Sequence, residues 1–328
     1  MPHDRFIVPA TPENIARAGE LLRAGELVAF PTETVYGLGA NALVQQAVTS
    51  IFARKGRPAS NPVIVHIASW EMLPQITPTW NDRMQRVAEQ FWPGPLTIIV
   101  PAGPQIPPIV TAGGATVGVR WPAHPIAQQI IQAAGVPIAA PSANRSGQIS
   151  PSLAHHVYQS FENDSPLIID GGPTSCGIES TVLDLTVTPA VVLRPGPIQA
   201  KEIAALLGEE VLLQDTARKE VTLKSPGLLS RHYAPRTPVL LAHNHEEFMK
   251  MLVVHPGSLG VTHQLIDPEW DDHLWLMPEK PEAYAKILYS VLHQLDAKNL
   301  PHLVWLLPEN TPPWAAVRNR LIRAATAE

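Results

Sequence analysis

The sequence predicts an α/β protein with two domains, and three observations lead to this prediction. The chain has 328 residues, which is more than one hydrophobic core usually organises. Short apolar or β-branched runs bounded by glycine and proline recur along it, as is typical of strands buried in a sheet. Segments with helical periodicity lie between several of these runs, so we expect helices to cover the sheet.

The first expected element is a helix over residues 11–26. Thr11 is placed to cap it, Pro12 suits its first position, and Gly25 favours its end. Strands are expected at residues 27–31, 62–67, 96–101, 136–141, 166–170, 180–185 and 190–195. Further helices are expected at residues 44–54, 80–91, 124–134 and 199–208. The first domain is therefore α/β or α+β, with a largely covered sheet.

The periodicity weakens after Gly208 and resumes at Thr237. We therefore expect a first domain at 1–208, an ordered linker at 209–236 and a second domain at 237–328. In the second domain the pattern predicts strands at 238–242, 259–262, 274–277 and 302–307, and helices at 245–252, 281–297 and 312–325. This alternation indicates a small Rossmann-like layer without a GxGxxG fingerprint. Its tryptophans are expected to be core and interface aromatics: Trp270, Trp275, Trp305 and Trp314.

Composition excludes several classes of function. A formal charge of -5 and a pI near 6.2 argue against a broad electrostatic grip on nucleic acid. A single cysteine, Cys176, excludes an internal disulfide and a multi-cysteine metal site, and we expect it to be a small buried residue. No apolar run approaches the roughly 20 residues that span a membrane, and the N-terminus has no signal-peptide pattern, so we expect a soluble, cytoplasmic protein.

A group of cations lies directly before the strand expected at 62–67. Arg54, Lys55 and Arg57 repel one another unless water or an anion neutralises them, so a solvated surface cluster is one interpretation. Their place before a buried strand is also what a phosphate site at a sheet edge requires. Arginine can bind two phosphate oxygens, and lysine acts as a point charge. The sequence therefore favours a polyphosphate as the bound anion.

Other polar residues lie at strand ends and in Gly/Pro loops, where side chains can converge. The run PTETVYGLGANA (31–42) carries Thr34, although it could equally be a tight turn that needs its glycines, with Tyr36 as a packing residue. Small polar residues in such turns often cap their own backbone, but a preceding apolar strand tilts Ser142 and Asn144 toward ligand contact. Further candidates in similar positions are Arg120, Ser150, Ser180 and Arg194.

Two kinds of chemistry find little support in the sequence. His66, at the end of an apolar strand, is by itself more typical of a structural histidine. No His, Asp and Glu set has metal-ligand spacing, and no nucleophile elbow or serine triad is present. Covalent catalysis is therefore disfavoured.

The order of these motifs resembles a known family. FPTETVYGLGANA, KGRPASNPVIVHI, WPGPLTIIV, TVGVRWPAHP, PSANRSG, STVLDL and LRPG follow one another between Phe30 and Gly196, and SPGLLSRHYAP follows them. Each block is modest alone, but in this order they resemble the YrdC/Sua5 family, specifically the long Sua5-type threonylcarbamoyl-AMP synthases. The resemblance implies a YrdC-like twisted mixed sheet flanked by helices, then a smaller Rossmann-like Sua5 C-terminal domain.

The resemblance also implies a reaction. L-Threonine, bicarbonate or CO2, and ATP would condense to threonylcarbamoyl-AMP with release of pyrophosphate. The product would pass to a separate tRNA threonylcarbamoyl transferase system that modifies adenosine 37, and any direct tRNA binding would be weak. Mg²⁺ would accompany the phosphates, held mainly by ATP and water and not by a protein carboxylate cage. Such a reaction needs orientation and charge neutralisation more than a protein nucleophile.

Site residues follow by matching positions. The resemblance assigns ATP contacts to Lys55, Arg57, Asn61, Thr116, Ser142, Asn144, Ser150, Arg194, His232 and Tyr233, with catalytic roles for Lys55, Arg57, Ser142 and Asn144. It assigns L-threonine to Thr34, His66, Arg120, the backbone at Ala140, and Ser180. His232 and Tyr233 would bring the linker over the nucleotide as a lid. The stretch Leu228, Leu229 and Ser230 departs from the more basic and aromatic pattern of the family, which weakens the case for a nucleotide contact there.

Alternative functions remain at this point. One is an RNA-binding module, against which the acidic net charge and the lack of basic-aromatic interleaving weigh. Another is a carbamoyl transfer enzyme of the hydrogenase-maturation kind, but nothing in the chain resembles the zinc-finger and acylphosphatase regions of that longer protein. The C-terminal domain could also be chiefly a scaffold or partner surface.

Overall fold

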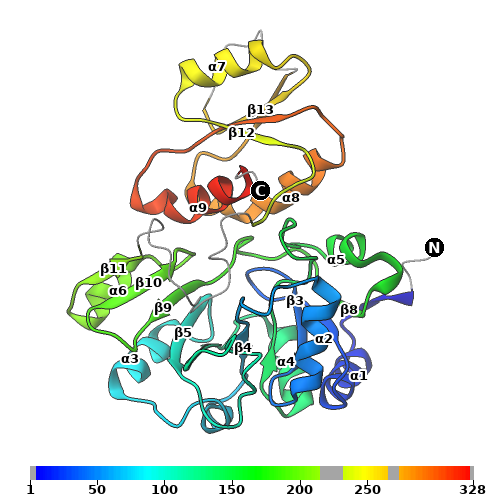
Figure 1. The fold of residues 1–328 in the computed structure, drawn as a ribbon, viewed down its shortest axis with the longest axis vertical. Helices are drawn as coiled ribbons and strands as arrows, with labels where there is room; N and C mark the ends of the chain where they lie inside the picture. The colour runs from blue at the N-terminus through cyan, green and yellow to red at the C-terminus, as the bar shows by residue number, and fades with distance from the viewer. Residues whose placement is uncertain (1–4, 215–231, 265–272, 326–328) are drawn as a thin grey trace. The chain divides into compact units, whose positions relative to one another are not determined.

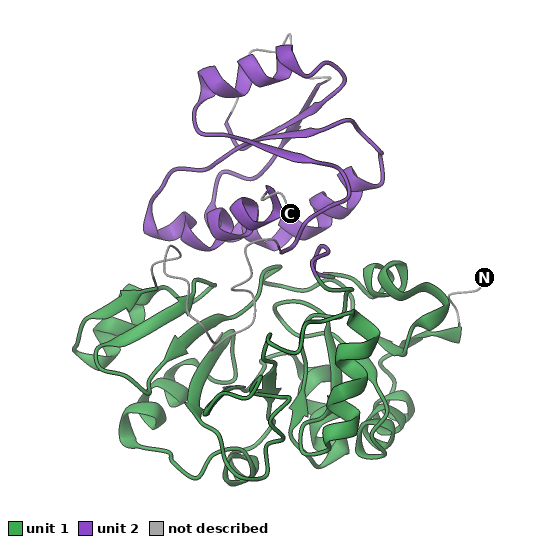
Figure 2. Cartoon of the chain, in the orientation of Figure 1, with its two compact units in different colours: residues 1–146, 151–228 green, residues 147–150, 229–328 purple. Residues whose placement is uncertain are grey.

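The computed structural model describes residues 5–214, 232–264 and 273–325. The chain divides into two compact units (Figure 2): unit 1 comprises residues 1–146 and 151–228, and unit 2 comprises residues 147–150 and 229–328. The expected boundary at 208 and the expected linker at 209–236 stay predictions, because residues 215–231 lie outside the described part. Among the described residues, none of the helices is long and apolar enough to cross a membrane.

Unit 1 is built on one mixed sheet (Figure 1). In the described residues its strand order is β1-β8-β2-β3-β7-β4-β6-β5-β9-β10-β11. The strands are β1 (Ile7–Pro9), β2 (Val28–Phe30), β3 (Gly37–Asn41), β4 (Ile64–His66), β5 (Leu96–Pro101), β6 (Thr116–Arg120), β7 (Ile138–Ala139), β8 (Leu167–Asp170), β9 (Thr181–Asp184), β10 (Ala190–Arg194) and β11 (Val211–Leu213). The sheet contains parallel pairs such as β4 with β6 and antiparallel pairs such as β5 with β6, so the expected mixed sheet is confirmed.

Helices pack against this sheet and against one another. They are α1 (Pro12–Arg23), α2 (Gln45–Lys55), α3 (Asp82–Phe91), α4 (Pro125–Ala134), α5 (Ala154–Phe161) and α6 (Ala200–Leu207), with 3-10 turns η2 (Trp70–Gln75) and η3 (Glu162–Asp164). The start of α1 is as predicted, because the Thr11 side chain accepts a hydrogen bond from the Asn14 N–H. Helices α1 and α4 lie side by side (Figure 1), and Arg23 of α1 donates to the Ala134 carbonyl.

Several elements of unit 1 were not predicted. The interpretation of residues 31–42 as a tight turn is wrong for Gly37–Asn41, which form the buried strand β3. Its glycines serve packing, because a Cβ at Gly39 would lie 2.6 Å from a ring carbon of Phe30. The weak periodicity of β6 and the short length of β1, α5 and β11 hid these elements from sequence analysis. Strand β11 falls inside the region expected to be linker.

Unit 2 has the predicted alternation of strands and helices. Its described strands are β12 (Val239–Ala242), β13 (Leu259–Thr262), β14 (Leu274–Leu276) and β15 (Leu303–Leu306), all paired in parallel in the order β12-β15-β13-β14. Its described helices are α7 (His245–Val254), α8 (Pro281–Asp296), the 3-10 turn η5 (Pro312–Trp314) and α9 (Ala315–Ala325). The Rossmann-like expectation is therefore confirmed.

The tryptophans of unit 2 meet different surroundings. Trp305 and Trp314 are buried, and the Trp305 ring N–H donates to the Tyr284 hydroxyl at 2.5 Å, so these two are core residues as expected. Trp275 is half-buried, and Trp270 lies outside the described residues.

Candidate active site

Most of the predicted site residues lie in unit 1, at or just beyond the ends of its strands. Thr34 follows β2, His66 and Arg120 end β4 and β6, and Arg194 ends β10. Parallel pairing of β4 with β6 places His66 opposite Arg120, and the Ala140 N–H beyond β7 donates to the Ile64 carbonyl of β4. The sheet thus assembles residues that are more than a hundred positions apart in the chain.

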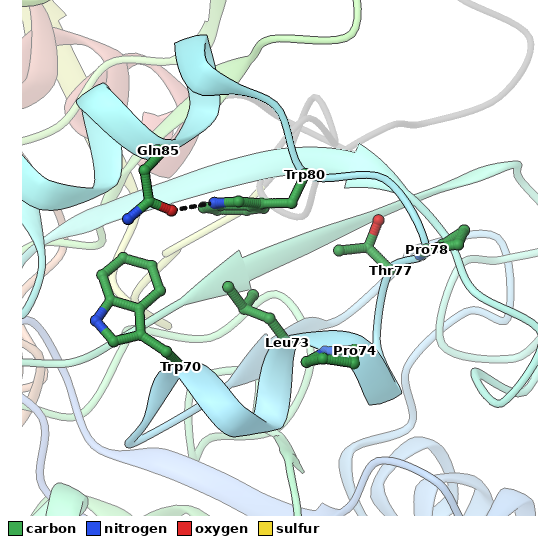
Figure 3. A pocket seen from close by; sticks show the side chains of 7 residues that line it. All are labelled: Trp70, Leu73, Pro74, Thr77, Pro78, Trp80 and Gln85. Carbon is green, nitrogen blue, oxygen red and sulfur yellow. Dashed lines mark hydrogen bonds between the residues drawn. The ribbon is translucent and has the colours of Figure 1, made fainter.

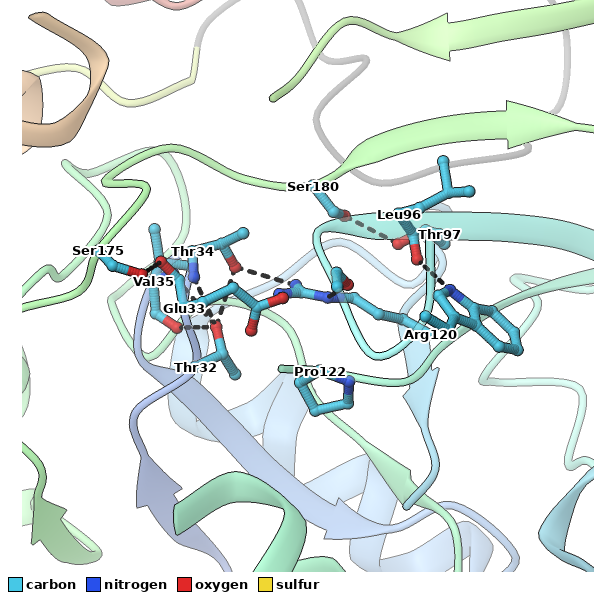
Figure 4. A network of polar contacts seen from close by, with 12 residues as sticks. Thr32, Glu33, Thr34, Val35, Leu96, Thr97, Arg120, Pro122, Ser175 and Ser180 are labelled. Carbon is cyan, nitrogen blue, oxygen red and sulfur yellow. Dashed lines mark hydrogen bonds and ion pairs between the residues drawn. The ribbon is translucent and has the colours of Figure 1, made fainter. Parts of the chain in front are cut away.

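Arg120 is the centre of a buried polar network (Figure 4). Its guanidinium donates to the Thr34 hydroxyl at 2.9 Å and to the Gly94 carbonyl at 3.3 Å, and forms an ion pair with the Glu33 carboxylate at 2.8 Å. Thr32 Oγ1 donates to the Val35 carbonyl, so the Thr34 hydroxyl is the donor in the 2.9 Å contact between the two threonines. A fixed chain of hydrogen bonds therefore orients Thr34 toward Arg120 as an acceptor.

His66 lies beside this network and is buried. Burial, followed by the charge of the nearby Arg120, lowers the pKa of its imidazole from 6.5 to about 3. His66 is therefore neutral at physiological pH, and a neutral imidazole offers one donor and one acceptor to a neighbouring group.

Lys55 anchors a loop of the site from the end of α2. Its ammonium donates to the Ser142 carbonyl at 2.6 Å and also to the Asn144 carbonyl. Burial, followed by repulsion from Arg57, holds the pKa of Lys55 well below its usual value. These contacts tie residues 142–144 to α2, and an isolated bridge pairs Ser142 with Gly37 of β3.

The three cations of residues 54–57 occupy different surroundings. Arg57 is buried, and its guanidinium donates to the carbonyls of Asn61 at 3.0 Å and Pro62 at 2.6 Å. Arg54 instead reaches the partly exposed side chain of Asp164, with which it forms an ion pair at 3.4 Å. The surface interpretation therefore fits Arg54, and Arg57 is a buried cation beside Lys55.

A second buried arginine lies at the end of β10. Arg194 donates to the Ser180 carbonyl at 3.0 and 3.1 Å and to the Ser180 hydroxyl at 3.2 Å. That hydroxyl also contacts Thr97 Oγ1 of β5 at 2.8 Å. Thr116, at the start of β6, is half-buried.

Three of the residues assigned to ATP belong to unit 2. The Ser150 carbonyl lies 3.2 Å from a ring nitrogen of His293. Tyr233 is buried and has a positive φ of 65°. The centre of its ring lies 5.6 Å from that of Tyr289 and 4.0 Å from that of His232, which packs edge-on against the Tyr233 ring. Their predicted role over the nucleotide stays a prediction, and the Leu228, Leu229 and Ser230 stretch lies outside the described residues.

Sequence analysis missed some participants and misjudged one. Glu33 was visible in the PTET run but received no role, and Thr97 and Gly94 carried no signal that sets them apart from other strand and turn residues. Cys176 was expected to be buried, but it is only half-buried in the loop before β9, where its backbone N–H donates to the Glu33 carbonyl. Burial raises the pKa of its thiol.

A separate cavity of about 490 Å³ lies in unit 1 (Figure 3). It is lined by apolar and aromatic side chains that include Trp70, Leu73 and Trp80, and the Trp80 ring N–H donates to Gln85. None of the predicted site residues lines it. The polar network around Arg120 is therefore the better candidate for catalysis.

Comparison with known proteins identifies the family of this chain. Residues 20–196 match the family model described as "Telomere recombination" (Sua5_yciO_yrdC), and residues 198–326 match "Threonylcarbamoyl-AMP synthase, C-terminal domain". The chain is 41% identical to "Threonylcarbamoyl-AMP synthase" of Pyrococcus abyssi over 94% of this chain and 93% of that protein. It is 38% identical to the Bacillus subtilis protein of the same name over 98% of this chain and 97% of that protein.

A solved structure is similar over nearly the whole chain. It is described as "Crystal structure of P. abyssi Sua5 complexed with L-threonine", with a TM-score of 0.88, 39% identity, and coverage of 97% of this chain and 96% of that one. Both units are thus accounted for by one family, and the motif order that suggested it is explained. The chain belongs to the Sua5/YrdC family of threonylcarbamoyl-AMP synthases, with both the catalytic and the Sua5 C-terminal regions present.

Proposed function

We propose that this protein condenses L-threonine, bicarbonate or CO2, and ATP into threonylcarbamoyl-AMP with release of pyrophosphate. The observation that carries the proposal is the buried Arg120, held beside Thr34 and His66 at the strand ends. The similar P. abyssi protein was crystallised with L-threonine, which supports an amino acid as the ligand of this network.

Arg120 has the donors that an amino-acid carboxylate requires. A guanidinium carries five N–H groups, and among the described residues the contacts of Arg120 with Gly94, Thr34 and Glu33 engage three of them. Two N–H groups remain for the two oxygens of the threonine carboxylate, which a planar fork can bind together. His66, Ser180, the Thr34 hydroxyl and the backbone at Ala140 surround the rest of the amino acid in this proposal.

Lys55 and Arg57 are proposed to bind the phosphates of ATP. Both cations are buried, so water would only weakly screen their attraction to the phosphates. Lys55 also orders the loop that carries Ser142 and Asn144, to which we assign phosphate contacts together with Asn61, Thr116, Ser150 and Arg194. His232 and Tyr233 are proposed to close over the nucleotide and exclude water from the product, a mixed anhydride that hydrolyses readily.

The reaction then needs positioning more than covalent chemistry. The threonine ammonium first loses a proton, and the neutral amine bonds the carbon of CO2 with loss of a second proton, or the carbon of bicarbonate with loss of water, to give a carbamate. An oxygen of the carbamate then attacks the α-phosphorus of ATP as pyrophosphate leaves. Arg57 and Lys55 would stabilise the charge that develops on the phosphates. ATP enters as its Mg²⁺ complex, with the ion held by phosphate oxygens and water.

The product has a proposed destination. Threonylcarbamoyl-AMP is an activated acyl donor, and we assign it to a tRNA threonylcarbamoyl transferase system that modifies adenosine 37. The proposed location is the cytoplasm, where that system would work. We propose only weak direct binding to tRNA, consistent with a net charge of -5.

The test is pyrophosphate release by the purified chain with Mg-ATP, leaving out L-threonine or bicarbonate in turn. Release that requires both, with serine giving much less, is expected. Release without threonine would contradict the proposal. Salt-dependent tRNA binding without any ATP turnover would instead favour an RNA-binding function.

A further inference from the structure

Glu33 has a buried carboxylate to which the proposed mechanism assigns no role. Its side chain is 8% exposed, and its Oε1 pairs with Arg120. Its other oxygen, Oε2, has no hydrogen-bond donor among the described residues, and Oε1 has none apart from the ion pair. A buried carboxylate loses its hydration, so an oxygen without a donor costs free energy unless a ligand supplies one.

The Glu33 carboxylate points toward the Arg120 guanidinium. In Figure 4 its carboxylate lies next to the guanidinium and near Thr34. The backbone of Glu33 is held by a hydrogen bond, in which its carbonyl accepts from the Cys176 N–H at 2.7 Å. The carboxylate is therefore held at the site by its own main chain and by Arg120.

We propose that Glu33 accepts the α-ammonium group of L-threonine, so that Arg120 and Glu33 together form a receptor for the amino-acid zwitterion. This inference rests on the proposed function and deepens it. In an α-amino acid the ammonium nitrogen and the carboxylate are attached to the same carbon. A carboxylate bound to the remaining N–H groups of Arg120 therefore brings the ammonium close to the guanidinium, and Glu33 is the anion paired with that guanidinium.

The charges around the pair favour this arrangement. His66 is neutral because its pKa is lowered to about 3, and burial also lowers the pKa of His124, even though the Glu33 charge acts on it in the opposite direction. Arg120 and Glu33 thus offer one positive and one negative group side by side, which matches the opposite charges of the ligand. A ligand in which a hydroxyl replaces the ammonium would satisfy Arg120 but offer Glu33 only a neutral donor, which makes a weaker contact than a charged one.

The test compares two ligands by calorimetry on the full chain: L-threonine, and the 2,3-dihydroxybutanoate of the same configuration, in which a hydroxyl replaces the amine. The wild-type protein is expected to bind threonine much more tightly. Glu33→Gln keeps the shape but removes the charge, and should weaken threonine binding by about 10- to 100-fold while changing binding of the analogue by less than about threefold.

A matched control is Asp184→Asn, another buried carboxylate of unit 1, whose oxygen accepts from Thr186 outside this network. It should leave the preference for threonine over the analogue intact. Equal loss of both ligands in Glu33→Gln, or unchanged threonine binding, would overturn the proposal. Should Glu33→Gln not fold, wild-type protein that binds the analogue as tightly as threonine would overturn it alone.

These outcomes are distinct from a failure of the proposed function. Pyrophosphate release that depends on threonine in the wild type supports the function whatever Glu33 does. Wild-type protein that neither binds threonine nor releases pyrophosphate would remove the function, and the role of Glu33 with it.

Discussion

Arg54, Lys55 and Arg57 lie within four positions of the chain, yet their side chains have different partners. Arg54 pairs with Asp164 near the surface, Lys55 donates to two carbonyls, and Arg57 donates to the carbonyls of Asn61 and Pro62. Charge and spacing did not distinguish these cations, although the family resemblance assigned only Lys55 and Arg57 to ATP. Their separation depends on the end of α2, where Gly56 takes a left-handed conformation with φ 61° and turns the chain between Lys55 and Arg57.

This difference predicts opposite results for two arginine variants. Arg57→Ala should lower kcat/KM for ATP in the pyrophosphate assay by about 10- to 100-fold, since it removes a buried charge-assisted contact to the phosphates. Arg54→Ala, which removes a cation of the same kind paired at the surface, should leave ATP kinetics near the wild-type value. Equal kinetics for both variants would take Arg57 out of the proposed site.

His66 gives a prediction about pH. Burial lowers its pKa from 6.5 to about 3, so between these values the unfolded chain binds a proton that the folded chain does not. The stability that neutral His66 contributes is therefore present above pH 6.5 and is lost as the pH falls toward 3. At pH 5 the loss is about 2 kcal/mol relative to neutral pH.

Urea unfolding at pH 7.5 and pH 5 measures this effect. The free energy of unfolding of His66→Asn should fall by about 2 kcal/mol less than that of the wild type over this interval. His155→Asn, at an exposed position, serves as the control and should follow the wild-type curve. A wild-type fall matched by His66→Asn would show that His66 does not titrate as proposed.

At the scale of elements, helix α1 shows which features a sequence can reveal. Its cap Thr11, its Pro12 and the glycine after its last turn are local signals, and the structure has the helix at Pro12–Arg23. Strand β3 has no such signals, because its residues Gly-Leu-Gly-Ala-Asn carry little strand propensity. What makes it a strand is tertiary: Phe30 fills the space over Gly39.

Replacing Gly19 of α1 with alanine is predicted to destabilise the protein, although alanine has the higher helix propensity. Alanine would normally stabilise a helix interior by about 1 kcal/mol relative to glycine. A Cβ at Gly19, however, would lie 2.6 Å from the backbone of Ala133 in α4. Gly19→Ala should therefore lower the free energy of unfolding by about 1–3 kcal/mol, because the two helices must move apart.

Thermal or urea unfolding checks this prediction, with Glu20→Ala on the exposed side of the same helix as control. The control should change stability by no more than about 0.5 kcal/mol. A Gly19→Ala protein as stable as, or more stable than, the wild type would show that α1 and α4 can separate at no cost.

At the scale of the whole molecule, sequence analysis predicted the two α/β regions and the family, because the order of the motif blocks is specific even where each block is weak. It could not predict the partners inside the site. Arg120 was assigned to L-threonine from the resemblance, but its contacts with Glu33, Thr34 and Gly94 depend on pairing between distant strands. Glu33 was therefore visible in the sequence and had no role until the fold placed it against Arg120.

The sheet that joins these segments also governs when the site can exist. The site residues of unit 1 come from positions between Glu33 and Arg194, and the contact of Thr97 with Ser180 requires the pairing of β5 with β9, two strands more than eighty residues apart. Contacts between such distant segments form late in folding, after the cost of closing long loops has been met. During synthesis, a ribosome must extend the chain past Arg194 before the threonine and nucleotide contacts can be complete. A chain that ends before Arg194 therefore has no assembled site with which to consume ATP.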